Sequence, residues 1–196
     1  MGDLVLEVGA GSGILTSELA RRARAVVAVE LDPVLATRLR RRFARWPNVT
    51  VLEGDARRLP LPREPFRVVA NVPFNSTTAL LRHLLDPCRS LTRADLVLQW
   101  EVARKHAGRQ RTALGTAWAP WWRFRLGRRI PPAAFRPPPT VSAGVLVVTR
   151  REPPLLPDAA FAEYARFTKA LFEGKLATEL DARHLAALFE AYAASR

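Results

Sequence analysis

The apolar positions of this chain form short runs that alternate with segments of helical spacing. Five aliphatic runs in the first hundred residues are bounded by polar residues or glycine, as expected of buried strands. They cover residues 4–8, 25–30, 49–53, 67–71 and 95–99. Apolar residues recur at helical spacing over residues 14–23, 33–45, 76–85 and 101–107. Strands that alternate with helices at these intervals indicate βαβ units and a parallel sheet.

The pattern therefore predicts an α/β fold, with a doubly wound, Rossmann-like sheet and helices on both faces. After Gly108 the pattern changes, and residues 121–126 and 144–149 alternate in the manner of strands on either side of a proline-rich loop. Two such strands would give the mostly parallel sheet an antiparallel edge. Helical spacing returns beyond residue 157. We expect a main domain over residues 1–152 and a short helical appendage over residues 153–196.

The composition is that of a globular chain with a polyanionic partner. Its 196 residues fit one domain with a small appendage, and a hydrophobic content of 48% can bury an ordinary core. Lys and Arg number 31 against 18 acids, so the formal charge is +13. Such a balance favours nucleic acid as the partner. No apolar run approaches the roughly 20 residues of a membrane span, and no charged-then-apolar leader follows Met1, so we expect a cytoplasmic protein.

Neither cysteine nor histidine suggests a metal site. Cys88 is the only cysteine, which excludes an internal disulfide, and we expect it to be a buried small residue. The three histidines are scattered without ligand spacing. We therefore expect no metal.

A glycine-rich turn follows the first predicted strand and opens the first helix. Gly9, Gly11 and Gly13 lack Cβ atoms, which permits a tight turn and close approach of a ligand to backbone amides. Glu30 ends the second strand, where a carboxylate can take both hydroxyls of a ribose. Asp55 follows the third strand and could accept a hydrogen bond from an adenine amino group, or simply form a turn beside glycine. Such a site would suit NAD, FAD or S-adenosylmethionine, and the glycine pattern alone also fits a plain loop.

The tetrapeptide Asn71-Val72-Pro73-Phe74 at the end of the fourth strand favours one of these cofactors. An aromatic amine is a poor nucleophile because its lone pair is delocalised into the ring. If the Asn71 side-chain oxygen and the Val72 carbonyl each accept one N–H, the nitrogen is held pyramidal, with its lone pair aimed at a sulfonium methyl. Pro73 fixes the turn, and Phe74 can stack on an extruded base, a contact worth roughly 1–3 kcal/mol. The motif predicts methylation of an exocyclic amine from S-adenosylmethionine, driven by positioning and hydrogen-bond acceptors.

Five motifs in order carry a family resemblance. They are LEVGAGSGILT at residues 6–16, VELD at 29–32, GDA at 54–56, NVPFNSTT at 71–78 and FRPPPTV at 135–141. The chain resembles the rRNA adenine N6-methyltransferases over nearly all of residues 3–172. Within them it is more similar to the Erm (erythromycin-resistance) enzymes than to the small-subunit rRNA adenine dimethyltransferases, which usually have Tyr where this chain has Phe74. The family also has a segment before the first strand and a longer helical C-terminal domain.

The resemblance implies roles for individual residues. It implies that Gly9, Gly11 and Gly13 line the methionine part of S-adenosylmethionine, that Glu30 holds its ribose, and that Asp55 holds its adenine amine. The expected cofactor-binding residues are Glu7, Gly9, Gly11, Gly13, Glu30, Asp32, Asp55, Ala56 and Asn71. The expected catalytic residues, which would hold the target adenine, are Asn71, Val72, Pro73 and Phe74. The expected RNA-binding residues, beyond the fifth strand near the active-site rim, are Arg104, Lys105, Arg109 and Arg111.

The implied reaction is N6-methylation, with one or two methyl groups, of an adenosine in protein-free or precursor 23S rRNA. Its implied consequence is resistance to macrolide, lincosamide and streptogramin B antibiotics, and a monomer is implied as well. Three alternatives stay open: a small-subunit rRNA adenine dimethyltransferase, a DNA adenine N6-methyltransferase with a similar amine-binding motif, and a non-catalytic RNA-binding relative that retained the fold.

Overall fold

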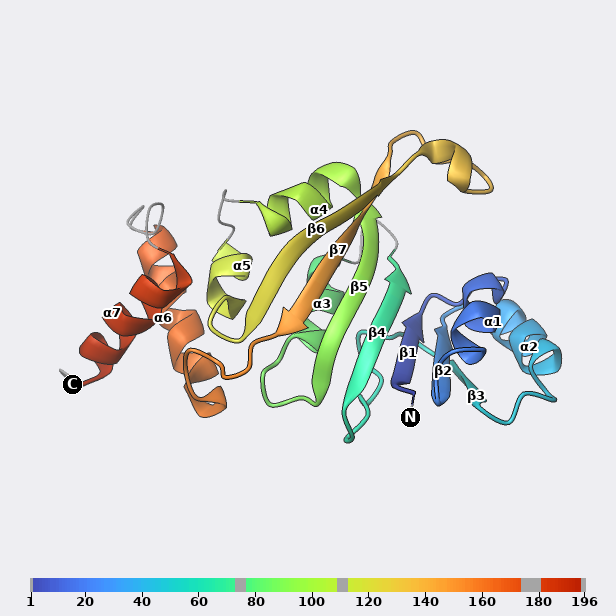
Figure 1. Cartoon of the computed structure of the whole chain (residues 1–196), viewed down its shortest axis with the longest axis horizontal. Helices are drawn as coiled ribbons and strands as arrows, with labels where there is room; N and C mark the ends of the chain where they lie inside the picture. Colours follow the sequence, from blue (N-terminus) through green and yellow to red (C-terminus); the bar gives the residue numbers. More distant parts are fainter. Residues whose placement is uncertain (1, 73–76, 109–112, 174–180, 195–196) are drawn as a thin grey trace.

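The computed structural model describes residues 2–72, 77–108, 113–173 and 181–194, and in it seven strands form one sheet in the order β3-β2-β1-β4-β5-β7-β6 (Figure 1). The strands are β1 (Leu4–Val8), β2 (Ala25–Glu30), β3 (Val49–Glu53), β4 (Phe66–Asn71), β5 (Leu91–Gln99), β6 (Trp122–Ile130) and β7 (Ala143–Arg150). The helices are α1 (Ile14–Ala20), α2 (Pro33–Arg42), α3 (Thr77–Leu84), α4 (Trp100–Ala107), α5 (Ala113–Trp118), α6 (Phe161–Glu173) and α7 (Ala182–Ala194). Two short 3-10 helices cover Pro132–Ala134 and Asp158–Ala160.

The direction of the strands confirms the predicted fold class. Strands β1 to β5 pair in parallel, whereas β7 pairs antiparallel with both β5 and β6. Every residue of β1 is buried, so both faces of the sheet are covered at its centre. The chain leaves β1 towards β2 on one side and returns to β4 on the other, and this reversal is the place where doubly wound sheets bind ligands.

The start of helix α2, next to the expected ligand-binding edge of the sheet, is determined by the local sequence. Asp32 is its N-cap, and the Asp32 side chain accepts hydrogen bonds from the amides of Val34 at 2.7 Å and Leu35 at 3.2 Å. Pro33 occupies the first turn, where its missing N–H costs nothing. The start of α2 is thereby fixed directly after β2, at the edge of the sheet where ligands bind.

The C-terminal helices lie at the end of the molecule opposite to α1 and α2 (Figure 1). Aromatic rings join them to the sheet domain: Tyr164 of α6 lies 5.7 Å from Trp121 and 5.3 Å from Phe189 of α7, measured between ring centroids. Asp158 also accepts a hydrogen bond from Arg150 at 2.6 Å. The core of the sheet therefore continues into the helical appendage, and the boundary after residue 152 stays a prediction.

Several details differ from the expectations. Strand β5 begins at Leu91 rather than at residue 95, and β6 covers Trp122–Ile130 rather than residues 121–126. Helix α5 was not foreseen, because six residues are too few to show helical spacing. Helices α1 and α2 end three residues earlier than expected. Cys88 was expected to be buried and is exposed, since it lies in the turn after α3, where its amide donates to the Asp86 side chain at 3.0 Å. Among the described residues, no helix is both long and apolar enough to cross a membrane.

Candidate active site

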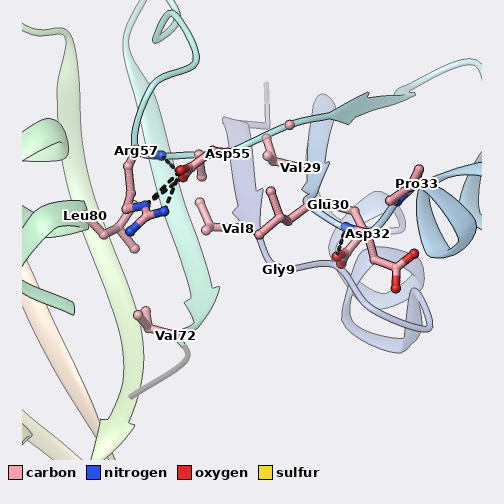
Figure 2. Close-up of a pocket in the computed structure, with 13 residues that line it drawn as sticks. Val8, Gly9, Val29, Glu30, Asp32, Pro33, Asp55, Arg57, Val72 and Leu80 are labelled. Carbon is pink, nitrogen blue, oxygen red and sulfur yellow. Dashed lines mark hydrogen bonds and ion pairs between the residues drawn. The ribbon is translucent and has the colours of Figure 1, made fainter. Parts of the chain in front are cut away.

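A cavity of about 440 Å³ opens at the carboxyl ends of the first strands (Figure 2). Its walls come from four separate parts of the sequence: the end of β1, the β2–α2 junction, the turn after β3, and the region from β4 to α3. The lining residues are Val8, Gly9, Val29, Glu30, Leu31, Asp32, Pro33, Gly54, Asp55, Ala56, Arg57, Val72 and Leu80. We call it the first cavity. Five of the nine residues expected to bind a cofactor line it: Gly9, Glu30, Asp32, Asp55 and Ala56.

The Glu30 carboxylate holds the glycine turn and the start of α2 by hydrogen bonds to backbone amides. One of its carboxylate oxygens accepts a hydrogen bond from the Gly11 amide at 2.7 Å, and the other accepts one from the Asp32 amide at 3.0 Å. Glu30 is 8% exposed and still lines the first cavity. Since a carboxylate oxygen can accept two hydrogen bonds, each retains capacity for a hydroxyl donor. The predicted role of Glu30 towards a ribose is therefore compatible with its structural one.

The glycines of the turn have different reasons to lack a side chain. Gly9 has a φ of +75° and lines the first cavity. Gly13 has a φ of +79°, and a Cβ atom there would lie 2.7 Å from both Leu39 and Phe43 of the α2 region. Gly13 thus permits α2 to pack against the turn, rather than a ligand to approach it. The expected contact of Gly11 and Gly13 with a cofactor stays a prediction.

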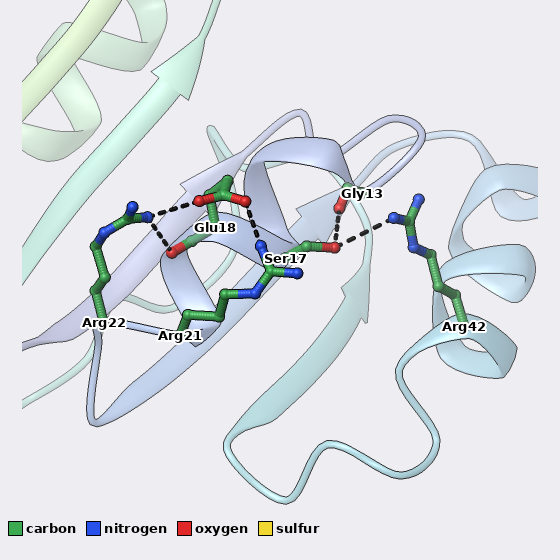
Figure 3. Close-up of polar contacts among 6 residues, drawn as sticks. All are labelled: Gly13, Ser17, Glu18, Arg21, Arg22 and Arg42. Carbon is green, nitrogen blue, oxygen red and sulfur yellow. Dashed lines mark hydrogen bonds and ion pairs between the residues drawn. The ribbon is translucent and has the colours of Figure 1, made fainter.

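A second set of contacts holds the turn from the outside (Figure 3). The Arg42 guanidinium donates to the Ser12 carbonyl at 2.6 Å and to the Ser17 hydroxyl at 3.2 Å. The Ser17 hydroxyl donates in turn to the Gly13 carbonyl at 3.0 Å. Glu18, one residue further along α1, is paired with Arg21 and Arg22. The N-terminus of α1 has no side-chain cap, and the contacts from Arg42 and Ser17 hold the turn through its carbonyl groups.

Asp55 lies across the first cavity from Glu30 and is paired with Arg57, a residue that the sequence analysis did not single out (Figure 2). The Arg57 guanidinium donates to both Asp55 oxygens, at 2.6 Å for the shortest contact. These hydrogen bonds lower the pKa of Asp55 to about 2. Asp55 is thus ionised and can only accept hydrogen bonds.

Glu7 is a buried acid close to the same turn. It is 1% exposed, and its Oε2 atom has no hydrogen-bond partner among the described residues. Burial raises its pKa to about 7. The unpaired Oε2 atom fits a cationic group that a ligand would bring, because a nearby cation favours the ionised form of the acid. With Glu30, Asp32 and Asp55, it makes this region acidic, which suits the ammonium and sulfonium of S-adenosylmethionine better than the pyrophosphate of NAD or FAD.

A second cavity of about 240 Å³ adjoins the first. It is lined by Asn71, Val72, Val97, Phe135, Pro137, Pro139 and Ala143, and Val72 lines both cavities. Asn71 is expected from the sequence to contact both the cofactor and the target base, and of these two cavities of the described residues it lines the second. Its part in cofactor binding stays a prediction. Pro73 and Phe74 lie outside the described residues.

Phe135, Pro137 and Pro139 had no role assigned from sequence, although they belong to one of the five motifs. Sheet pairing brings them to Asn71, because Asn71 pairs with Val97 in β5 and Gln99 of β5 pairs with Ala143 of β7. The motif Phe-Arg-Pro-Pro-Pro was the signal in the sequence that could have identified these residues. The motif lies far from Asn71 along the chain, so the sequence gave no indication that the two are neighbours in space. An aromatic ring beside an amide-lined cavity is suited to a planar base.

The predicted RNA-binding residues are only partly described. Arg104 is paired with Glu101 at 2.7 Å, Lys105 is exposed, and Arg109 and Arg111 lie outside the described residues. The structure points to further cations. Strand β6 runs parallel in direction to β5, so its carboxyl end lies at the edge of the sheet that carries the cavities. The arginines of this strand are Arg123, Arg125, Arg128 and Arg129.

Arg129 is held over the Trp100 ring at 5.3 Å, and Arg128 is exposed. They would place positive charge beside the second cavity. Within the described part of the chain, no group of three or more potential ligands could hold a metal ion.

Comparisons by family model, by sequence and by structure all find similarity to rRNA methyltransferases. Residues 2–186 match the family model described as ribosomal RNA adenine dimethylase. The mycinamicin-resistance protein MyrB of Micromonospora griseorubida is 44% identical over 172 residues, which cover 87% of this chain and 54% of that protein. The ribosomal RNA small subunit methyltransferase A of Synechococcus sp. (strain JA-3-3Ab) is 42% identical over 159 residues, covering 76% of this chain and 57% of that protein.

Among solved structures, that of the 23S rRNA methyltransferase ErmE superposes with a TM-score of 0.80 at 34% identity, covering 88% of this chain and 71% of that one. The chain spans between half and two thirds of the length of curated relatives such as MyrB. The methyltransferase sheet predicted from sequence is thereby confirmed.

Proposed function

The chain belongs to the ribosomal RNA adenine dimethylase family, and from that premise we propose that it transfers methyl groups from S-adenosylmethionine to N6 of an adenosine in 23S rRNA. One observation carries the proposal. Two cavities meet at Val72, one bordered by acidic residues and the glycine turn, the other by Asn71 and an aromatic ring. A methyl donor in the first and a purine in the second would meet at the boundary between them.

The first cavity has the groups that the cofactor requires. Glu30 would accept the ribose hydroxyls and Asp55 the adenine amine. Glu7 is buried beside the lining residue Val8, and in its ionised form it would offset the charge of the ammonium. Bound there, S-adenosylmethionine would supply an electrophilic methyl group on a sulfonium. The apolar walls of the cavity, which include Val8 and Val29, would exclude water and so strengthen these interactions.

In the second cavity, Asn71 and Val72 would act on the target amine. The side-chain oxygen of Asn71 and the carbonyl of Val72 would each accept one N–H, which fixes the nitrogen and directs its lone pair. Phe135 would contact the base, and the two prolines of its motif would give the cavity a rigid wall. The rate enhancement in this scheme comes from orientation and from acceptors already in place, without a strong base.

The names of two relatives support a large-subunit target and a role in resistance: MyrB is a mycinamicin-resistance protein, and ErmE is a 23S rRNA methyltransferase. The small-subunit alternative is the stronger of the rivals, because its representative is nearly as similar in sequence. Phe74 and the VLQ and ARK segments at residues 97–99 and 103–105 favour the Erm type. We expect a cytoplasmic monomer that acts on protein-free or precursor rRNA.

Incubation of the 196-residue chain with labelled S-adenosylmethionine tests the proposal. Three acceptors would be offered in parallel: protein-free 23S rRNA, protein-free 16S rRNA and duplex DNA. Label in 23S rRNA alone is expected, and the mass of the modified fragment would give the number of methyl groups. Label in 16S rRNA alone would establish the small-subunit function. RNA binding without transfer, unchanged in an Asn71→Ala variant, would favour a non-catalytic relative.

A further inference from the structure

Arg57 is the one residue that brings a positive charge to the lining of the first cavity, which otherwise has only acidic and uncharged side chains among the described residues. It lies two residues after Asp55, in the turn that follows β3. Its guanidinium faces the Asp55 carboxylate on the side of the cavity opposite to Glu30 (Figure 2). None of the five sequence motifs includes it.

The contacts between the two residues leave Asp55 with a defined remaining capacity. The Arg57 backbone amide donates to Oδ1 at 2.9 Å, and the Arg57 Nε–H is shared between Oδ1 at 2.8 Å and Oδ2 at 3.0 Å. The Nη2 group donates to Oδ2 at 2.6 Å. The two oxygens can together accept four hydrogen bonds and take three from Arg57, so the carboxylate retains room for about one more donor.

This two-point contact fixes the plane of the Asp55 carboxylate and also keeps the carboxylate ionised. An Arg fork holds both oxygens at once, whereas a Lys ammonium would act as a point charge and leave the carboxylate free to turn. The free lone pairs of Asp55 therefore have a set direction. An acceptor-only group so oriented can take an amino N–H, but it repels a carbonyl oxygen in the same place.

We propose that Arg57 is a positioning residue that makes the adenine end of the first cavity selective for a 6-aminopurine over a 6-oxopurine, acting through Asp55. This inference rests on the proposed function, which puts the adenosyl part of the cofactor there. The Arg57 side chain, at 42% exposure, can reach Asp55 without being buried itself. Its removal would therefore leave the fold intact while freeing the carboxylate.

The test compares the binding of S-adenosylhomocysteine and its 6-oxo analogue, S-inosylhomocysteine, by calorimetry. The wild-type chain is expected to prefer the amino form by on the order of 10- to 100-fold, the range for a hydrogen bond to a charged group. In Arg57→Ala the preference should fall about tenfold, almost wholly through weaker binding of the amino form. Arg57→Lys should behave like Arg57→Ala, because it restores the charge but not the fork.

Arg58→Ala is the matched control. Arg58 is the next residue in the same turn and does not line the first cavity. Its amide donates to the Asp55 carbonyl, and its guanidinium acts on the Asp55 carboxylate through charge, with no side-chain hydrogen bond between them among the described residues. The preference of Arg58→Ala for the amino form should equal that of the wild type.

A kinetic measurement separates binding from turnover. In Arg57→Ala the kcat at saturating cofactor should be unchanged, and the loss should be confined to the KM for the cofactor.

The outcomes separate this inference from the proposed function. If the wild type binds S-adenosylhomocysteine with the expected preference and Arg57→Ala keeps that preference, the role of Arg57 is overturned alone. An equal loss of both ligands, or tighter binding of the amino form, would also overturn it, by indicating a structural role or a competing contact. If the wild type binds neither ligand, the cofactor assignment fails and the inference fails with it.

Discussion

Gly9 and Asn71 lie close together beyond the ends of β1 and β4, where the order of the strands reverses: a Cβ atom on residue 9 would lie 3.4 Å from the backbone carbonyl oxygen of Asn71. Gly9 lines the first cavity and Asn71 the second, so the two halves of the candidate site meet where these two residues approach each other. The φ of Gly9, +75°, is one that residues with side chains rarely adopt.

Gly9→Ala should therefore weaken cofactor binding as well as the fold. The left-handed backbone costs about 1–2 kcal/mol once a Cβ is present, which should appear in the free energy of unfolding measured with denaturant. Gly11→Ala is the control, because Gly11 also has a positive φ, +55°, but its Cβ would meet only the Gly9 carbonyl, at 4.0 Å. Both variants should lose stability, and Gly9→Ala should lose more affinity for S-adenosylhomocysteine than Gly11→Ala, because Gly9 lines the first cavity and Gly11 does not. Equal affinities in the two would contradict a role for the contact with Asn71.

Asn71→Ala should abolish most of the methyl transfer while cofactor binding persists. Asn71 lines only the second cavity, and removal of one preorganised hydrogen-bonding group typically costs on the order of 100-fold in kcat. Single-turnover transfer to RNA measures the first effect, and calorimetry with S-adenosylhomocysteine the second. A parallel loss of cofactor affinity would instead support the expectation that Asn71 also contacts the cofactor.

Glu7 should make the stability of the protein depend on pH. Burial raises its pKa from 4.5 to about 7 in the folded state, so the fold holds a proton that the unfolded chain releases. The contribution of Glu7 to stability is complete below pH 4.5 and is lost as the pH rises through 7, by up to about 3 kcal/mol.

A Glu7→Gln variant should remove this loss. Relative to the wild type, its free energy of unfolding should increase between pH 4.5 and 8, as measured by urea denaturation at several pH values. Glu152→Gln, at an exposed site, serves as the control and should show no such trend. A constant difference between Glu7→Gln and the wild type over this range would mean that Glu7 is already ionised in the fold.

Arg128 should contribute to RNA binding through phosphate. It is exposed at the carboxyl end of β6, on the edge that carries both cavities. Arg128→Ala should lower the slope of log affinity against log salt by about 1, the effect of one lost phosphate contact. Arg63→Ala provides a control at the opposite edge, before the start of β4, and should leave the slope unchanged. Identical slopes in the two variants would exclude Arg128 from the interface.

The sequence by itself determined the elements and their local chemistry. The alternation of apolar runs and helical spacing predicted five parallel strands and a two-stranded antiparallel edge, and the helical spacing from residue 33 gave the start of α2 at its actual residue. These features depend on neighbours within a few positions, so they can be read from the chain directly. The glycine turn and the acid at the end of β2 are local in the same sense.

The tertiary structure alone decided how these pieces divide into two cavities. The pairing of Asn71 with Val97, and of β5 with β7, brings Phe135 to Asn71 in the second cavity, which adjoins the cavity of Glu30 at Val72. The packing of α2 against Gly13, the hydrogen bonds of Arg57 to Asp55 and the burial of Glu7 likewise depend on which side chains meet in space. No periodicity along the chain encodes such meetings, because they follow from strand order and packing between segments that are distant in sequence.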